Sequence, residues 1–195
     1  MKTNFKRAAF IAVLPLLIGI KGVLHNVNIP YKITSNEATL AYLKERNEIR
    51  TLTARENAVY KLLSKYNSPL KDEYKTFVSV AKDNDLDWTL LVAISGVEST
   101  FGKNVSSYTY NPFGWGQGRV FKDWKDSIEA VGAGVGNYRT KYGAQEIEEI
   151  ALIYCPPTSR SWAFGVNYFK KELEDLEKEQ DSLGTLPVKG ESLSH

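Results

Sequence analysis

Apolar residues three or four positions apart run through most of this chain, the spacing of one face of an α-helix. Six segments carry such a stripe: residues 59–63, 74–81, 90–97, 128–138, 147–154 and 162–176. No segment shows a convincing β-hairpin signal, and no internal repeat is present. The sequence therefore predicts an all-α fold, with at most a small irregular or β lobe.

Cap and breaker residues suggest where these helices begin and end. Thr53 with Glu56, and Asp126 with Glu129, have the spacing of capping boxes. Asp87 is typical of an N-cap for the helix that follows it. Prolines after the first and fifth stripes, at residues 69 and 156–157, are expected to end those helices.

The N-terminal end is typical of a membrane-directed segment. Lys2, Lys6 and Arg7 precede an uncharged apolar run over residues 8–20. That run is shorter than the about 20 apolar residues that usually span a bilayer, although the stem of Lys21 can extend it to the interface. We expect residues 1–25 to be a hydrophobic signal anchor or a cleaved signal peptide, with membrane contact through residues 8–24.

The rest of the chain divides into three parts. Residues 26–52 are expected to form a linker and a charged helix over 37–50, and residues 53–178 the main domain. The Gly-, Ser- and Pro-containing residues 179–195 are expected to be a disordered tail. Basic residues before the apolar run favour an N-terminus in the cytoplasm, with the domain on the outer side of the membrane. If the signal is cleaved, the domain is secreted.

Composition excludes several classes of chemistry. The net charge of +2 gives no support for nucleic-acid binding. Cys155 is the one cysteine, so no internal disulfide framework or cysteine-based zinc site can form. Both histidines, His25 and His195, lie outside the expected domain, which removes histidine triads and histidine metal sites from it. No metal and no cofactor are expected.

Glu98 does not fit its position in the sequence. It follows Ile94 by four residues and Leu91 by seven, so it lies on the apolar face of its own helix near the C-terminal end. Burial and the negative end of the helix dipole both raise the pKa of a carboxyl group there. A protonated carboxyl is what a general acid needs. The alternative is a helix-terminal Glu paired with Lys103 or Arg119.

Aromatic and amide side chains crowd the segment after this helix. Its rings are suited to stack on the apolar faces of sugars, its amides match sugar hydroxyl and acetamido groups, and its glycines permit close approach of a ligand. We take Ser99, Asn111, Phe113, Gly114, Trp115, Gly116 and Gln117 as candidate substrate-binding residues. Tyr108 and Tyr110 belong to the same cluster. The alternative is a loop whose rings fold over the core as a lid.

Several motifs in order resemble the bacterial lysozyme-like superfamily, closest to glucosaminidase-domain proteins and soluble lytic transglycosylases. The apolar helix at 84–103 carries Ala-Ile-x-x-x-Glu-Ser-x-x-Gly, and Asn-Pro-Phe-Gly follows at 111–114. Ala-x-x-Tyr stands at 151–154, and residues 161–169 resemble the closing helix of that superfamily. Cys155 departs from the pattern, which has Asn after the Tyr. The resemblance covers residues 53–176.

This resemblance implies a lysozyme-like fold that cleaves the glycan strands of peptidoglycan on the cell-wall or periplasmic side. Glu98 would be the catalytic acid/base, and Tyr154, a second catalytic candidate, would point at the acid or the substrate. The alternative for Tyr154 is a core residue whose hydroxyl caps a backbone group. Ser99 would hold the geometry beside Glu98, and Gly102 would form a tight turn. Phe113, with the Gly114 and Trp115 that follow it, would form one wall of the glycan groove.

The number of carboxylates separates two reaction types. A hydrolase usually needs a pair, and the next acidic residue after Glu98 is Asp123, a candidate for the second. Without it, a group of the sugar must act instead, as in lytic transglycosylases, whereas the glucosaminidase resemblance favours hydrolysis. Two other functions stay open: a catalytically weak peptidoglycan-binding module, and a scaffold that uses residues 37–50 and the tail to hold partners.

Overall fold

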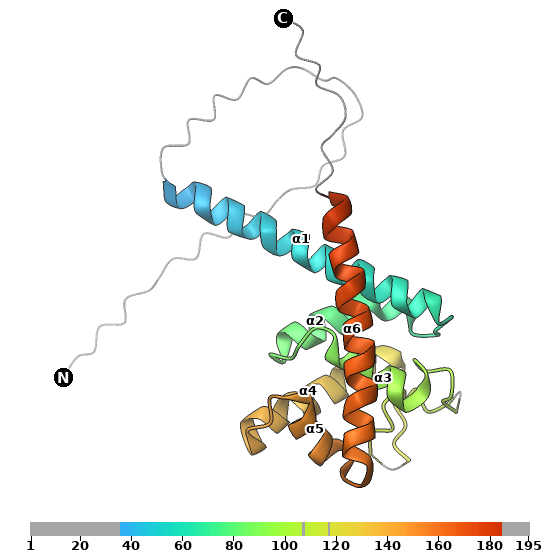
Figure 1. Cartoon of the computed structure of the whole chain (residues 1–195). Helices are drawn as coiled ribbons and strands as arrows, with labels where there is room; N and C mark the ends of the chain where they lie inside the picture. The colour runs from blue at the N-terminus through green and yellow to red at the C-terminus, as the bar shows by residue number, and fades with distance from the viewer. Residues whose placement is uncertain (1–35, 107, 117, 185–195) are drawn as a thin grey trace, which may run out of the picture.

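The computed structural model describes residues 36–106, 108–116 and 118–184, with side chains to residue 180, and every regular element within them is helical (Figure 1). In order these are α1 Asn36–Lys65, η1 Lys71–Glu73, α2 Tyr74–Asp83, α3 Leu90–Ser99, α4 Trp124–Tyr142, α5 Ile147–Tyr154, η2 Pro156–Thr158 and α6 Ser159–Gly184. The predicted all-α class is confirmed. The described part of the segment between α3 and α4 contains no strand.

The short helix α3 lies at the centre of the molecule. Its residues from Leu90 to Gly96 are all buried, as is Ser99, because the other helices surround it. A helix that is apolar on all sides is stable only in such an interior position. The long helix α6 packs along α3 and then crosses α1, while α4 and α5 close the opposite end (Figure 1). This arrangement places the C-terminal end of α3 near the start of α6.

Helix α1 is continuous where the sequence predicted two elements. The predicted start at Thr53 is wrong: its hydroxyl donates to the carbonyl of Ile49 at 2.9 Å, one turn earlier in the same helix. Threonine can bond to the backbone inside a helix as well as at its start, and no Gly or Pro interrupts residues 50–53. The expected boundary between residues 52 and 53 therefore lies within α1.

The start of α4 also differs from the prediction. Asp123, and not Asp126, is the N-cap, and its carboxylate accepts the N–H of Asp126 at 2.8 Å. Asp126 in turn accepts the N–H of Lys122 at 3.0 Å. The predicted cap at Asp87 accepts the N–H of Thr89 at 3.0 Å, in the turn just before α3. The helix ends expected before residues 67–69 and before Pro156 are confirmed.

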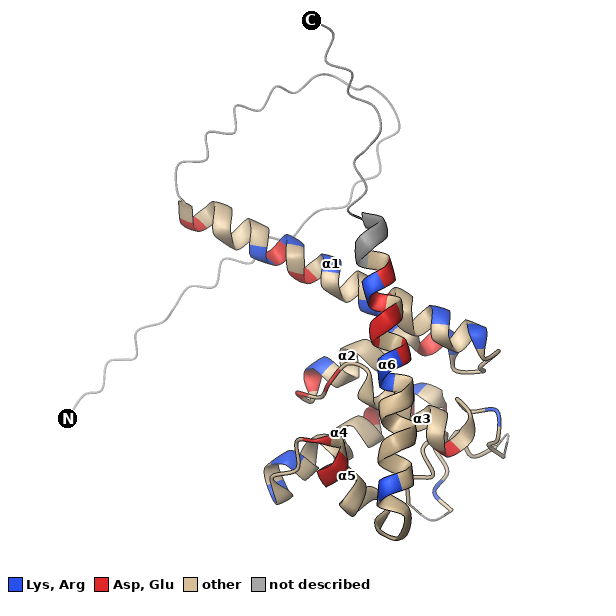
Figure 2. Ribbon diagram, viewed as in Figure 1, with Lys and Arg blue, Asp and Glu red and all other residues tan. Residues whose placement is uncertain are grey.

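Helix α6 extends to Gly184, so the expectation of disorder from residue 179 is wrong for residues 179–184. Its stripe continues through Leu173, which is fully buried. Three ion pairs join it to α1: Arg55 with Glu177 at 3.0 Å, Lys61 with Glu179 at 3.3 Å, and Lys65 with Glu172 at 2.5 Å. Charged residues gather where the two helices cross (Figure 2). Residues 185–195 lie outside the described residues.

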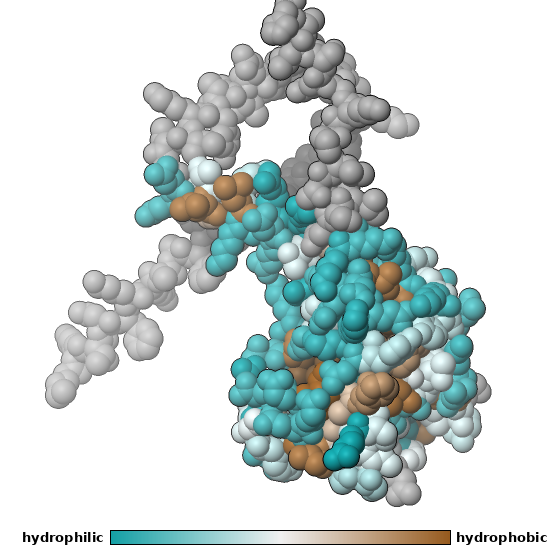
Figure 3. All heavy atoms as spheres, in the orientation of Figure 1, coloured by the Kyte–Doolittle hydropathy of each residue, from teal (hydrophilic) through white to brown (hydrophobic). Residues whose placement is uncertain are grey.

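The first half of α1 projects from the body as an arm, residues 36–50. All of these residues except Thr39 are exposed, including Leu40, Tyr42 and Ile49. Apolar atoms are visible on the projecting end of α1 in Figure 3. Within residues 36–184, where described, no helix is long and apolar enough to cross a membrane. The expected anchor at 8–24 lies outside the described residues.

Candidate functional site

Glu98 lies in the last turn of α3 and is half-buried. Its Oε1 accepts the indole N–H of Trp162, a buried residue in the first turns of α6, at 2.7 Å. Loss of water raises the pKa of the Glu98 carboxyl, and the hydrogen bond from Trp162 opposes this only in part. The position predicted from the helix period therefore does give a carboxyl whose pKa is raised.

No cation of the described residues neutralises this carboxyl. Among the described residues, Glu98 forms no ion pair, which contradicts the alternative of a pair with Lys103 or Arg119. The guanidinium of Arg119 lies instead over the ring of Phe121, 4.7 Å from its centre. An unpaired, partly desolvated carboxyl is typical of a functional group and not of a surface residue.

Gly114 leaves the second oxygen of Glu98 uncovered. Its φ of +59° is in the left-handed region that favours glycine, and a Cβ atom placed there would lie 3.1 Å from Oε2 of Glu98. Gly114 itself is exposed. Oε1 thus faces the indole, while Oε2 faces the backbone of the exposed Gly114, which has no side chain to cover it.

Ser99 ties the loop to α3 and does not face a substrate. It is buried, its hydroxyl donates to the carbonyl of Pro112 at 2.7 Å, and it accepts the N–H of Gly102 at 2.8 Å. The turn expected at Gly102 is present, with φ +80°. The role implied for Ser99, geometry beside Glu98, agrees with these bonds, whereas a buried hydroxyl that is already bonded within the protein does not support the prediction that Ser99 binds substrate.

The side chains of Asn111 and Phe113 also stabilise the loop itself. The Asn111 side chain accepts the N–H of Trp115 at 3.0 Å and donates to the carbonyls of Trp115 and Arg119, so its amide is used internally. Phe113 is fully buried and packs edge-on against Phe77. The prediction that its side chain lines a glycan groove is therefore wrong; only its carbonyl reaches the site.

Tyr154 joins that carbonyl to the indole beside Glu98. Its hydroxyl donates to the carbonyl of Phe113 at 2.6 Å, and its ring stacks on Trp162 with centres 5.0 Å apart. Burial, with the charge of Glu98 as a smaller cause, raises the pKa of Tyr154 well above its ordinary value. Tyr154 therefore stays protonated and acts as a structural donor, the alternative that the sequence left open.

A run of aromatic rings leads away from Glu98. Trp162 stacks on Tyr154, Tyr154 contacts Trp115 at 5.6 Å, Trp115 contacts Tyr138 at 5.9 Å, and Tyr138 contacts Tyr142 at 6.1 Å between ring centres. We call these five residues the aromatic ladder. The sequence pointed to Trp115 and Tyr154 but missed the other three as site residues.

Helical spacing explains how α4 contributes to the ladder. Gly134, Tyr138 and Tyr142 are four residues apart and share one face. The Trp115 ring fills the space at Gly134, where a Cβ would come within 2.4 Å of it. That spacing was present in the sequence and could have indicated Tyr138 and Tyr142. Of the two remaining candidates, Gly116 packs near Arg119, and Gln117 lies outside the described residues.

A second carboxylate is not part of this arrangement. Asp123, the candidate, uses its carboxylate to cap α4. Among the described residues, no second carboxylate shifts the pKa of Glu98, and Glu98 is the one carboxylate that shifts the pKa of Tyr154. Cavities of about 330, 400 and 550 Å³ lie elsewhere, and Glu98 lines none of these three. In the described ranges, no three His, Cys, Asp or Glu side chains gather as metal ligands would.

Comparison with protein-family models, with curated proteins and with solved structures finds no match for this chain.

Proposed function

We propose that this protein cleaves the glycan strands of peptidoglycan with Glu98 as general acid and base. One observation carries the proposal: a half-buried carboxyl that pairs with no cation among the described residues, bonded to an indole N–H through one oxygen and facing Gly114 with the other. The lysozyme-like motifs around it supply the substrate class. Membrane anchoring through residues 8–24, with the domain on the outer side, would bring the site to the cell wall.

The first step is proton transfer from Oε2 of Glu98 to the glycosidic oxygen. The bond from that oxygen to the anomeric carbon breaks, the leaving sugar keeps the proton, and positive charge develops on the remaining ring. Glu98 is then a carboxylate, stabilised by the Trp162 N–H. It next acts as the base that takes a proton from the incoming nucleophile.

The single carboxylate favours a nucleophile from the sugar itself. Since Asp123 caps a helix, no described side chain is assigned to attack the anomeric carbon or to activate water from the opposite face. The 6-hydroxyl of the same muramyl ring can attack instead, losing its proton to Glu98 and closing a 1,6-anhydro ring. We therefore favour a lytic transglycosylase over a hydrolase.

The test uses the full-length protein, purified peptidoglycan and mass spectrometry of the products. We expect anhydromuramyl ends, and a loss of roughly 10²–10⁴-fold in rate for Glu98→Gln. Glu129→Gln, at an exposed position of α4, is the control and should retain the rate. Reducing ends in place of anhydro ends would mean hydrolysis. Wall binding without products from the parent protein would instead indicate the catalytically weak binding module.

A further inference from the structure

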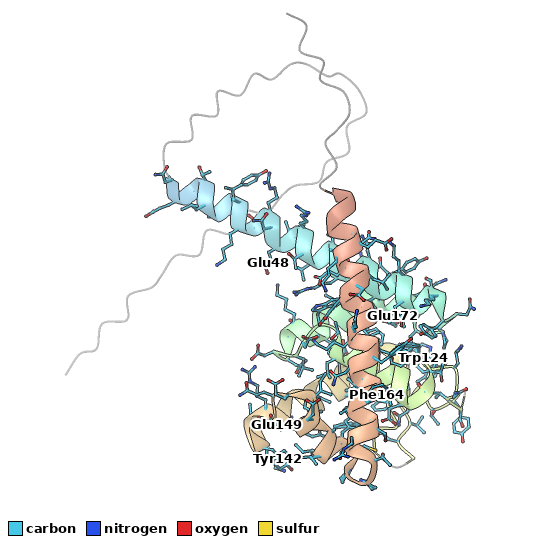
Figure 4. The ribbon with its side chains drawn as sticks, in the orientation of Figure 1. Glu48, Trp124, Tyr142, Glu149, Phe164 and Glu172 are labelled. Atoms are coloured by element: carbon cyan, nitrogen blue, oxygen red, sulfur yellow. The ribbon has the colours of Figure 1, made fainter. Side chains whose placement is uncertain are left out.

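The aromatic ladder is buried at Trp162, beside Glu98, and exposed at its other end, Tyr142. Trp162 is 4% exposed, the next three rings are half-buried, and the side chain of Tyr142 is 56% exposed. The rings come from four places in the chain: α6, α5, the loop before α4, and α4. Figure 4 shows Tyr142 at the opposite end of α4 from Trp124, on the outer edge of the domain.

Packing explains the inner rings but not Tyr142. Trp115, Tyr138 and Tyr154 all pack against the hydrophobic core, whereas Tyr142 does not belong to it. Tyr142 is the last residue of α4, before a left-handed Gly143 that ends the helix. Since a large exposed ring at a helix end contributes little to folding, its position at the end of a run of contacting rings needs another explanation.

We propose that Tyr142 is a remote sugar-binding subsite, and that the substrate strand runs from Glu98 along the aromatic ladder to it. This inference rests on the proposed function and extends it. A tyrosine offers an apolar ring and a hydroxyl, which together match the apolar face and the hydroxyl edge of a sugar. The rings between the two ends, Trp115 and Tyr138, give the strand an unbroken aromatic path.

The charge beside Tyr142 indicates what kind of strand would bind. The Lys141 ammonium lies 5.0 Å from the centre of the Tyr142 ring, and Lys141 forms no ion pair with any described residue. This ammonium, which is also hydrogen-bonded to the side chain of Tyr142, favours a glycan whose sugars carry carboxylates, as muramyl sugars do through their lactyl and peptide groups. The subsite therefore matches the acidic glycan of the proposed function.

Such a contact lies far from the bond that breaks, so it should stabilise bound substrate and transition state alike. Uniform binding of this kind changes KM and leaves kcat unchanged. It also acts only on strands long enough to reach Tyr142. Chain-length dependence is thus the property that separates a remote subsite from a general effect on the structure.

The experiment measures binding in full-length Glu98→Gln protein in detergent, so that turnover does not interfere. The probes are a trimer and a hexamer of β-1,4-linked N-acetylglucosamine. Their binding is followed by the change in Trp fluorescence. We expect Tyr142→Ala to weaken binding of the hexamer by roughly three- to tenfold and to leave the trimer unchanged. Tyr142→Phe, which keeps the ring, should restore most of the hexamer affinity.

The matched control is Tyr42→Ala. Tyr42 is 58% exposed, close to the value for Tyr142, but it lies on the α1 arm, so hexamer binding should not change. Equal hexamer affinity for Tyr142→Ala and Tyr42→Ala would overturn the subsite and leave the proposed function intact. So would a loss for trimer and hexamer alike. If no oligosaccharide binds and the parent protein releases no products from peptidoglycan, the proposed function fails, and the subsite with it.

Discussion

Glu98 is held in the protein at some expense to stability. Its carboxyl loses water on folding, gains one hydrogen bond from Trp162, and finds no cation. Groups that serve chemistry are often less stable in place than a neutral substitute would be. A residue selected for folding alone would not combine these properties, so the unfavourable burial of the Glu98 carboxyl is itself an argument for function.

Glu98→Gln should therefore unfold at a higher temperature than the parent protein at neutral pH. The folded-state pKa of Glu98 is above its ordinary value of 4.5, so the unfolded state ionises first as pH rises, and the parent loses stability relative to the variant. Below the unfolded pKa both states are protonated and the difference should vanish. Thermal unfolding followed by circular dichroism across this pH range measures it; a variant less stable than the parent at neutral pH would contradict the prediction.

Trp162→Phe should shift the pH dependence of activity. The indole N–H lowers the pKa of Glu98, so its removal should raise that pKa and keep the acid protonated to higher pH. The alkaline limb of kcat/KM should then move to higher pH, while the Phe ring retains the contact with Tyr154. Trp124→Phe, at a tryptophan of α4 that does not bond to Glu98, should leave the profile in place.

At the scale of elements, one buried hydroxyl joins α3 to the loop. Ser99→Ala removes the bonds to the carbonyl of Pro112 and the N–H of Gly102. We expect a loss of about 1–3 kcal/mol in the free energy of unfolding, measured by urea denaturation. Ser79→Ala, at an exposed serine of α2, should change it by less than about 0.5 kcal/mol. Equal losses would show that the Ser99 bonds contribute nothing specific.

The helices could be predicted because burial imposes a repeat of 3.6 residues on each of them. Their starts were less certain, since Thr and Asp bond to the backbone in more than one setting. Thr53 bonds back within α1, and Asp126 accepts a bond as Asp123 takes the cap. The sequence pattern is the same in both cases, and only the neighbouring elements decide which bond forms.

The site was partly predictable for a related reason. Helix periodicity put Glu98 on a buried face, and the aromatic cluster indicated the loop beside it. Neither pattern could tell which side chains of the loop turn inward. Phe113 lies in the core and Asn111 bonds to its own loop, while Gly114 faces Glu98. The partner that fixes Oε1, Trp162, comes from a distant helix, and local patterns carry no such pairing.

At the scale of the whole molecule, α6 links the site to the crossing with α1. Leu173 is fully buried at that crossing, and Trp162 lies earlier on the same helix. Leu173→Ala should lower the free energy of unfolding by about 2–5 kcal/mol, and activity and helicity should be lost at the same urea concentration. Leu40→Ala, at a leucine of the arm that is 64% exposed, should stay within about 0.5 kcal/mol of the parent. Separate transitions for activity and helicity would show that the site unfolds on its own.

The unbroken course of α1 has a consequence for whatever holds its N-terminal end. A rigid helix transmits direction as well as distance: each residue added to the arm would move that end by about 1.5 Å and turn it by about 100° relative to the domain. Adding two residues would turn Glu98 almost to the opposite side of the α1 axis, whereas adding four would return it nearly to its original direction. The length of the arm therefore sets the direction in which the Glu98 carboxyl faces, relative to the N-terminal end of α1.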